Sequence, residues 1–280
     1  MSIICYGSVN PDLVHRLDRL PAPGDDVRSR SWAWCYGGKA ANAAAALAAW
    51  HADPLLLGLV VGADPLGEVL VGALEAAGVD PGWLERDPGT ETRHCVVLVA
   101  EGGQRTIVGT GYQDARWQQV PAAAWHRADA VLLDGLGGSA AEAVAEGARE
   151  RGIPVVWLDA DPGAVAPGEL VAWSRHEHTI AEAEGLAELG ARVLLTAGAD
   201  PVRVWWDGAR LEVTPPRVDA TDTTGSGDVV AAACAHGIVL GWEPERLVRW
   251  AVSAGAALCV GGREAGMPTA DEVEALYGAR

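Results

Sequence analysis

This chain of 280 residues contains no phenylalanine and only one lysine, Lys39, so the other 20 of its 21 basic residues are arginines. Basic residues are also scarce relative to the 38 acidic ones, and the formal net charge is -17. A surface that binds nucleic acid needs clustered positive charge, so this composition argues against a nucleic-acid partner. Because basic residues are few, any that lie near a phosphate site are more noteworthy.

The sequence also lacks regularly spaced cysteine motifs and long apolar runs. The five cysteines are odd in number, widely scattered and without C-x-x-C spacing, which predicts neither a disulfide framework nor a zinc site. No apolar run approaches the ~18 residues of a membrane span. The N-terminus also lacks the basic region and apolar core of a secretory signal. We therefore expect no membrane partner and a cytoplasmic setting.

The most informative stretch is Asp219-Ala-Thr-Asp-Thr-Thr-Gly-Ser-Gly-Asp228, which stands directly before an apolar, helix-forming run. Backbone N–H groups of Gly225, Ser226 and Gly227 would be unpaired at the positive end of the helix dipole, where anions bind. Asp228 in the first turn is either a helix cap or a general base. The two glycines around a serine favour the second interpretation, because a glycine-rich nest beside a carboxylate suits phosphoryl transfer.

Around this stretch, strands and helices alternate through most of the chain, which predicts one α/β domain over residues 1–280. We expect strands at 2–9, 54–61, 130–134, 154–159 and 193–196, a hairpin over 202–213, and helices at 43–50, 68–77, 140–151, 168–173, 182–189, 228–240, 244–259 and 270–277. Three strands end at Asp134, Asp159 and Thr196, so these side chains should meet at one edge of a parallel sheet. Two hairpins interrupt the alternation, at about 11–35 and 91–110, the second turning at 101–104. They predict a small sheet that could act as a lid.

Two further motifs place polar groups near strand ends and helix starts. Asn10-Pro-Asp12 follows the first strand, where Asp12 either hydrogen-bonds a polyol or forms a turn next to Pro11. Gly37-Gly38-Lys39-Ala-Ala-Asn42 opens a helix, and its glycines allow a ligand to approach the backbone. Lys39 and Asn42 are about one turn apart and should point the same way. A helix N-terminal cap is the simpler alternative for this motif.

These stretches, in this order, resemble the ribokinase-like (PfkB-type) sugar kinase family. The resemblance rests on Gly7-Ser-Val-Asn-Pro-Asp12 with Leu20-Pro-Ala-Pro-Gly24, on Gly37 to Asn42, and on Asp222 to Asp228. Weaker support comes from Gly62-x-Asp64-x-x-Gly67 and from Gly266-Met-Pro-Thr-x-x-Glu272. The family implies an α/β fold with a central, mostly parallel sheet flanked by helices, and a small β-sheet lid.

The resemblance also implies Mg²⁺ and ATP as cofactors, and transfer of the γ-phosphoryl group to a hydroxyl of a small sugar or polyol. By position, Asp228 would be the general base, with the N–H groups of Gly225, Ser226, Gly227 and Asp228 as the anion hole. A homodimer through the lid is a further implication. The other positions implied are Asn10, Asp12, Gly38, Lys39, Asn42 and, by a looser match, Asp134 for substrate, Thr196 and Gly198 for nucleotide phosphate, and Asp222 and Thr224 for a monovalent cation such as K⁺.

Three departures from the family pattern limit what the resemblance implies. The N-x-x-E motif that organises magnesium lacks its asparagine, because the segment reads His178-Thr-Ile-Ala-Glu-Ala-Glu184. Either Glu182 or Glu184 takes over the glutamate's role, or both are solvated helix charges. Alanines replace the glycine and glutamine usual in the ribokinase substrate motif, and Asp134 stands near the place of a longer glutamate, so ribose itself is in doubt.

Two alternative functions follow from these residues. One is a nucleoside or phosphosugar kinase of the same family. A phosphorylated substrate would need a cation such as Arg105 in the second lid hairpin, although an exposed surface arginine is the simpler interpretation. A relative that binds sugar and nucleotide without catalysis would explain the missing asparagine. The retention of Asp228 and its two glycines disfavours this second alternative.

Overall fold

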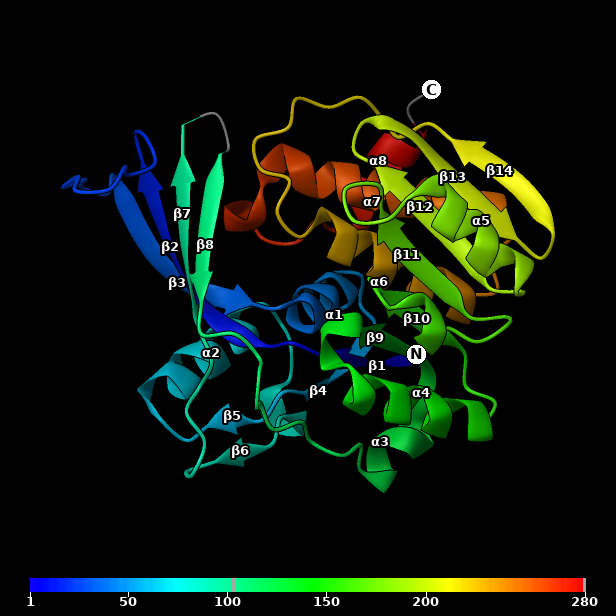
Figure 1. The fold of residues 1–280 in the computed structure, drawn as a ribbon, viewed down its shortest axis with the longest axis horizontal. Coiled ribbons are helices and arrows are strands. Elements are labelled where there is room, and N and C mark those ends of the chain that lie inside the picture. Colours follow the sequence, from blue (N-terminus) through cyan, green and yellow to red (C-terminus); the bar gives the residue numbers. More distant parts are fainter. Residues whose placement is uncertain (102–103, 279–280) are drawn as a thin grey trace.

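The computed structural model describes residues 1–101 and 104–278, and its core is a sheet of eight strands. Its order is β14-β13-β12-β11-β10-β9-β1-β4, in which β4 to β12 run parallel and the β13–β14 hairpin is antiparallel (Figure 1). The strands are β1 (Ser2–Gly7), β4 (Asp53–Gly58), β9 (Ala128–Asp134), β10 (Val155–Leu158), β11 (Leu170–Ser174), β12 (Arg192–Ala197), β13 (Asp200–Trp206) and β14 (Ala209–Val213). This arrangement confirms the predicted α/β class.

Helices cover both faces of this sheet, because successive side chains of its central strands point to opposite faces and both sets are apolar. In β1, Ile3 and Cys5 join the core beneath α1, α6 and α7, whereas Ile4 and Tyr6 join the core beneath α3, α4 and α5. The helices are α1 (Lys39–Ala49), α2 (Pro65–Ala76), α3 (Ala122–Arg127), α4 (Ser139–Glu150), α5 (Ile180–Glu188), α6 (Ser226–Val239), α7 (Pro244–Gly261) and α8 (Ala270–Gly278). Within the described residues, no helix combines the length and apolar character needed to cross a bilayer.

One predicted helix is wrong. Residues 168–173 were expected to be helical, but Leu170–Ser174 form β11 between β10 and β12. Four of its five residues are buried, because helices cover the sheet on both sides. A buried parallel strand therefore lacks the polar-apolar alternation that would have identified it.

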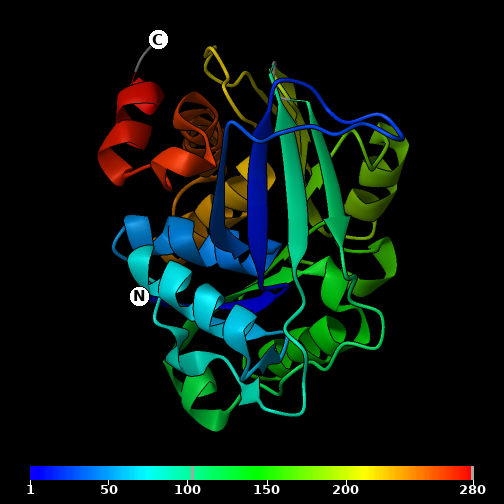
Figure 2. The same cartoon turned by 90° about the vertical axis from the view of Figure 1, so that its left-hand side faces the viewer.

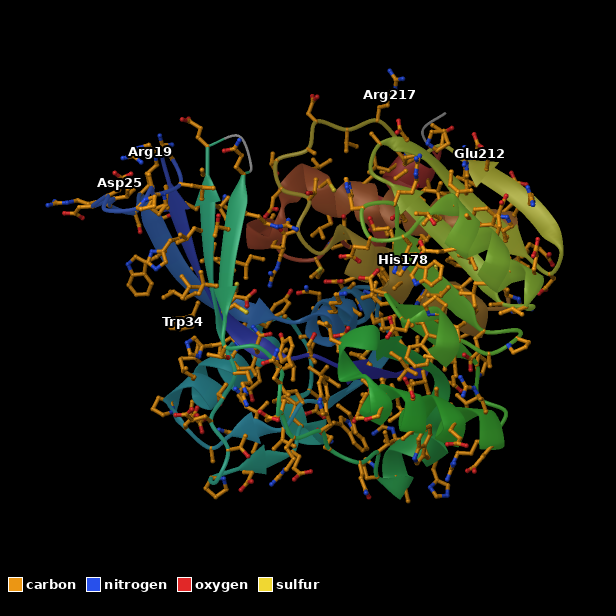
Figure 3. The ribbon with its side chains drawn as sticks, viewed as in Figure 1. Arg19, Asp25, Trp34, His178, Glu212 and Arg217 are labelled. Atoms are coloured by element: carbon orange, nitrogen blue, oxygen red, sulfur yellow. The ribbon has the colours of Figure 1, made fainter. Side chains whose placement is uncertain are left out.

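The two predicted hairpins combine into one separate sheet with the order β3-β2-β7-β8. Its strands are β2 (Asn10–Leu17), β3 (Ser31–Gly37), β7 (Cys95–Ala100) and β8 (Arg105–Gly109), and residues 102–103 of the turn predicted at 101–104 lie outside the described residues. The sheet rises from the strand ends of the body (Figure 2). Arg19 and Asp25 lie near its outer tip and Trp34 on its outer side (Figure 3). We call this four-stranded sheet the lid. A two-stranded sheet of β5 (Val61–Gly62) and β6 (Arg86–Asp87) lies below it.

The helix pair α6 and α7 packs around a buried histidine. The ring of His236 stacks on Trp250 with ring centroids 5.6 Å apart and meets Trp50 and Trp242 edge-on. Its Nδ1 has no hydrogen-bond partner among the described residues, and burial lowers the pKa of this imidazole. The protonated form is therefore disfavoured in the folded protein.

This environment predicts a pH-dependent loss of stability. Below the ordinary histidine pKa of about 6.5, the unfolded chain binds a proton that folded His236 does not, so acidification favours unfolding. We expect His236→Phe to gain stability relative to the wild type as the pH falls from 7.5 to 5.5, measured by urea unfolding. A parallel variant of the exposed His126 is the control. A gap between His236→Phe and wild type that does not change with pH would contradict the prediction.

Candidate active site

The motif before α6 forms a helix N-terminus with exposed backbone donors. Gly225 is the N-cap in the left-handed conformation (φ 82°), which glycine adopts without steric cost, and no side chain caps this helix. The N–H of Ser226 reaches the carbonyl of Thr223 at 3.3 Å, whereas those of Gly227 and Asp228 have no hydrogen bond in the described structure. These free donors at the positive end of a 14-residue helix form an anion site.

Asp228 is buried in the first turn of α6, at 8% exposure. One carboxylate oxygen accepts a hydrogen bond from Asn42 Nδ2 at 2.6 Å, although the two residues are 186 positions apart in sequence. Burial raises the pKa of Asp228 to about 7, against the opposing effects of the Asn42 hydrogen bond and the Lys39 charge. A carboxylate with a pKa near the operating pH is suited to remove a proton from a hydroxyl.

The pKa of about 7 predicts the pH profile of the reaction. Only the ionised carboxylate can accept a proton, so kcat/KM should fall about tenfold per pH unit below that value. We expect this acid limb in steady-state assays from pH 5 to 9, with the coupling enzymes tested separately at each pH. A fall of kcat/KM centred near pH 4 would contradict the raised pKa of Asp228.

The Gly38-Lys39 turn packs directly on the end of β1. Gly38 has φ 92°, and an added Cβ would lie 2.3 Å from the carbonyl oxygen of Ser8, so only glycine fits. The Lys39 N–H donates to Ser8 Oγ at 2.9 Å, and its Nζ contacts Asp159 at 2.5 Å. Burial works to lower the pKa of Lys39, but the charges of Asp134, Asp159 and Asp228 outweigh it and raise the pKa. Lys39 is therefore a firmly charged ammonium at the strand edge.

Asp134 supports the Gly38-Lys39 turn through its contacts with Ser8. It is fully buried, and its carboxylate accepts hydrogen bonds from the backbone N–H groups of Ser8 and Leu136, each at 3.0 Å, and from the Ser8 hydroxyl. Its oxygens are thus engaged within the protein. Asp134 thus holds Ser8, whose hydroxyl in turn accepts the Lys39 N–H.

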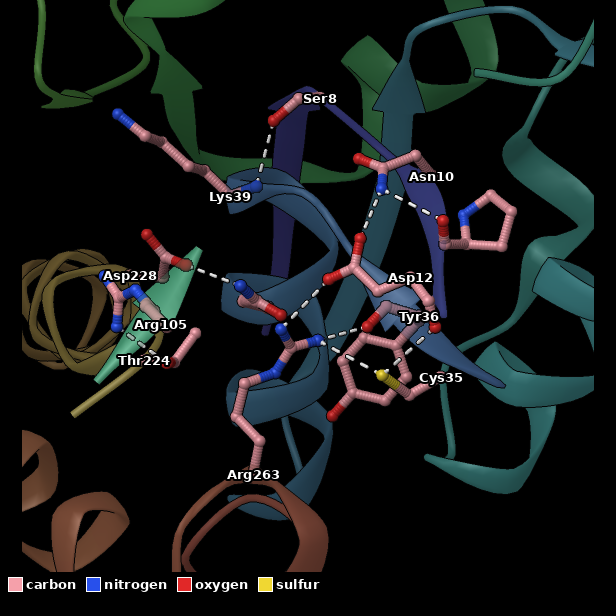
Figure 4. A network of polar contacts seen from close by, with 12 residues as sticks. Ser8, Asn10, Asp12, Cys35, Tyr36, Lys39, Arg105, Thr224, Asp228 and Arg263 are labelled. Atoms are coloured by element: carbon pink, nitrogen blue, oxygen red, sulfur yellow. Dashed lines mark hydrogen bonds and ion pairs between the residues drawn. The ribbon is translucent and has the colours of Figure 1, made fainter. Parts of the chain in front are cut away.

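A second polar network joins the base of the lid to the C-terminal part of the chain (Figure 4). The Asp12 carboxylate, 7% exposed, accepts Asn10 Nδ2 at 2.6 Å and pairs with Arg263 Nη1 at 3.2 Å. Tyr112 donates its hydroxyl to Asn10 Oδ1 at 2.7 Å, and Arg263 also donates to the Tyr36 carbonyl oxygen. Burial raises the pKa of Asp12, and the guanidinium opposes that shift. Asn10 and Asp12 belong to β2 rather than to a turn.

The two halves of the site meet at Asn42. Lys39 and Asn42 were expected to point the same way, yet Lys39 contacts Asp159 and Asn42 contacts Asp228. The Asn42 Oδ1 atom is buried and lacks a hydrogen-bond partner in the described part of the chain. A buried acceptor without a donor is costly, so Asn42 Oδ1 is a candidate partner for a ligand hydroxyl.

The loop before the anion site is anchored to the end of α7. Thr221 bonds the carbonyls of Cys259 and Val260, and Asp222 accepts the N–H of Thr224 at 2.9 Å. The hydroxyl of Thr224 accepts a hydrogen bond from Arg105 of β8 at 2.7 Å. Asp222 and Thr224, the predicted monovalent-cation residues, therefore lie together beside the anion site.

The predicted nucleotide residues lie at the β12 end and on α5. Thr196 donates to the Trp173 carbonyl at 3.1 Å, and Gly198 takes φ 63° in the following turn. Glu184 instead pairs with Arg210 of β14 at 3.2 Å, and Glu182 forms a capping box with Thr179. Another group could hold a cation: ligand atoms of Asp159, Glu177 and His178 lie within 4.8 Å of one another, and His178 is labelled in Figure 3.

Several residues of the site were not identified from the sequence. Arg263 and Tyr112 had no motif around them that indicated a ligand. Ser8 lay inside the motif from Gly7 to Asp12, but no role was predicted for it. Asp159 was noted only as a strand end. The one available signal for Arg263 was its place directly after Gly261-Gly262 at the end of a long apolar helix.

These features define a class of protein: a phosphotransferase with an anion site, a buried base and a polar acceptor site under a lid. Comparison with known proteins agrees. The model of the pfkB family carbohydrate kinases matches residues 1–168 and 165–270. The chain is 30% identical to a ribokinase of Bacillus subtilis (strain 168), with 98% of this chain and 99% of the relative covered. It is 32% identical to an ATP-dependent ribose-1-phosphate kinase of Halopiger xanaduensis, over 99% of this chain and 98% of the relative.

Solved structures give the same result for the fold. The structure of Arabidopsis thaliana ribokinase complexed with ribose and ATP superimposes with a TM-score of 0.82 at 23% identity, covering 100% of this chain and 99% of that one. The chain belongs to the pfkB family of carbohydrate kinases. It is an ATP-dependent sugar kinase, which transfers the γ-phosphoryl group to a sugar hydroxyl.

Proposed function

We propose that this kinase phosphorylates a ribose-type pentose, with Asp228 as the general base. The observation that carries the proposal is the Asn42–Asp228 pair. Asn42 Oδ1 is a buried acceptor without a donor, and the carboxylate beside it has a pKa of about 7. An acceptor hydroxyl placed between them would be oriented by Asn42 and deprotonated by Asp228. The two curated relatives described above act on ribose and ribose 1-phosphate, which makes these the first acceptors to test.

Each residue would contribute to a balanced transfer. ATP supplies the phosphoryl group. The acceptor oxygen forms a bond to the γ-phosphorus while the bond from that phosphorus to the bridging oxygen breaks, and ADP keeps the electron pair. Asp228 takes the hydroxyl proton. The N–H groups of Gly227 and Asp228 stabilise charge on the phosphoryl oxygens, and Asn10 and Asp12 hold the other sugar hydroxyls.

Cations complete the proposed site. Asp159 and Glu177 offer the carboxylate oxygens that Mg²⁺ prefers, and Asp159 is also paired with Lys39, a predicted substrate residue. We place a monovalent cation at Asp222 and Thr224, next to the anion site. Glu184, the predicted cofactor residue, likewise has its carboxylate paired with a cation, Arg210.

The lid supports a proposed homodimer. The exposed apolar side chains of Trp32, Ile107 and Val108 lie on its two edge strands, β3 and β8. Unpaired edge strands with apolar side chains readily pair with a second chain. We propose that two lids associate in this way, in a cytoplasmic enzyme whose other partner is a small sugar.

An ADP-release assay tests the proposal, with Mg-ATP and K⁺ and a panel of ribose, ribose 1-phosphate, fructose, fructose 6-phosphate and adenosine. Turnover with ribose or its 1-phosphate, abolished in Asp228→Asn, is the expected result. Strong turnover with adenosine or fructose 6-phosphate alone would refute the ribose-type substrate. Binding of sugar and ATP without any turnover would support the non-catalytic alternative.

A further inference from the structure

Three cationic side chains surround the site, and they differ in their partners. Lys39 contacts the Asp159 carboxylate, and Arg263 pairs with Asp12. Arg105 contacts only the neutral hydroxyl of Thr224 among the described residues. In a chain with net charge -17, an arginine at the site without a carboxylate partner is available to bind an anion.

The position of Arg105 is set by the lid. Every residue of β8 is exposed, so this edge strand can present its side chains to the site. Arg105 crosses from β8 to Thr224, which is 119 positions away in sequence. Figure 4 shows Arg105 and Thr224 together close to Asp228, apart from the Asp12–Arg263 pair. The guanidinium is therefore held by the segment that leads into the anion site.

Thr224 directly precedes Gly225, the N-cap of α6, so Arg105 reaches the entrance of the anion site. A guanidinium presents several N–H donors in a planar fork, which matches the oxygens of a phosphoryl group. The guanidinium binds an anionic phosphoryl oxygen more strongly than a neutral hydroxyl, because both partners are then charged. An incoming phosphoryl oxygen can thus replace Thr224 as the acceptor without the loss of an ion pair.

We propose that Arg105 is a catalytic residue carried by the lid, which contacts the transferred phosphoryl group and neutralises the charge that develops on its oxygens. The proposal rests on the proposed function of Asp228 and the anion site. The bond to the acceptor oxygen forms while the bond to the ADP oxygen breaks. During this transfer Arg105 donates hydrogen bonds to the phosphoryl oxygens from the lid, and the N–H groups of Gly227 and Asp228 donate to them from the helix. The proton still goes to Asp228, and Arg105 keeps its own protons. Closure of the lid and completion of the anion site are then one event.

The test compares Arg105→Gln and Arg105→Lys with wild type, and uses Arg30→Gln as the matched control. Arg30 also lies near a lid strand, but it pairs with Asp18. The first readout is calorimetric binding of Mg-ADP with and without fluoroaluminate, a mimic of the phosphoryl group in transfer. We expect Arg105→Gln to bind Mg-ADP within about twofold of wild type and to lose at least about tenfold in affinity for Mg-ADP with fluoroaluminate. The second readout is kcat, expected to fall about 10²-fold in Arg105→Gln, less in Arg105→Lys, and not in Arg30→Gln.

Other outcomes would overturn the proposal. Equal fluoroaluminate affinity in wild type and Arg105→Gln would remove Arg105 from the anion site. A defect confined to the KM of ribose 1-phosphate would place Arg105 on the acceptor's phosphate instead. Wild-type protein that binds neither Mg-ADP nor its fluoroaluminate complex would count against the nucleotide-dependent function itself, which separates the two failures.

Discussion

Replacing Asp228 by asparagine should lower kcat by roughly 10²- to 10⁴-fold, equivalent to about 3 to 5 kcal/mol in the chemical step. Asparagine keeps the size of the side chain and still offers an oxygen to Asn42 Nδ2, but it cannot take a proton from the acceptor. Asn10 and Asp12, the proposed sugar ligands, are held by one another and by Arg263 and not by Asp228. The KM for sugar should therefore change little while kcat falls, in steady-state assays with the acceptor that the panel identifies.

The same variant carries its own control for folding. Burial raises the pKa of Asp228 from 3.8 in the unfolded chain to about 7, so the wild type loses stability as the pH rises from about 4 to 7 and loses no more above that. Asp228→Asn should consequently be more stable than wild type at pH 8, and the difference should shrink at pH 5. Near-full turnover in Asp228→Asn would exclude this residue as the base. Lost turnover together with lost stability at pH 8 would mean that the fold had been damaged instead.

Replacing Arg263 by methionine should destabilise the protein by about 3 to 5 kcal/mol and raise the KM for sugar at least about tenfold. The change leaves the Asp12 carboxylate buried without its cation, and it removes the donor to the Tyr36 carbonyl. Since the cost comes from an unpaired charge, the deficit should be larger at pH 8 than at pH 5. Urea unfolding at both pH values measures it.

A double-variant cycle separates charge from packing in this pair. Asp12→Asn removes the buried charge, so adding Arg263→Met to it should cost much less stability than Arg263→Met alone. Only the free energies of unfolding are compared in this cycle, because Asp12 is itself a proposed sugar ligand and its loss would also change the KM for sugar. Additive losses in the double variant would show that Arg263 acts through packing and not through the Asp12 carboxylate.

The sequence was informative wherever backbone geometry or periodicity dictated the structure. The alternation of strands and helices predicted the layered fold, and the two hairpins predicted the lid strands. The Gly-Ser-Gly motif predicted a helix N-terminus with free donors, and α6 begins there at Ser226. The failure at 168–173 had a physical cause, because a four-residue apolar run buried on both faces has no period that separates strand from helix.

Side-chain partners were less predictable, because they depend on elements far apart in the chain. Arg263 and Asp12 are 251 positions apart, and no local motif connects them. No local motif showed that the Asp134 carboxylate accepts a hydrogen bond from Ser8, 126 positions away. Nor did one show that Glu184 pairs with Arg210, which follows from the packing of α5 against the strands at the edge of the sheet. Spacing identifies which element a residue occupies, and tertiary packing decides its partner.

The order of the central sheet has a consequence for synthesis on the ribosome. β1 pairs with β4 and β9, so its neighbours are complete once residue 134 has been made. On one face of that partial sheet α1 already covers β1 and β4, but β9 is covered mainly by α6, which begins only at Ser226 and packs against α7 from Pro244. The nascent chain must therefore hold the apolar face of β9 partly uncovered while about another hundred residues are added, a state that invites aggregation. We expect this kinase to need chaperone protection late in translation, and to gain its base only in the final stage of folding, since Asp228 lies on one of those last helices.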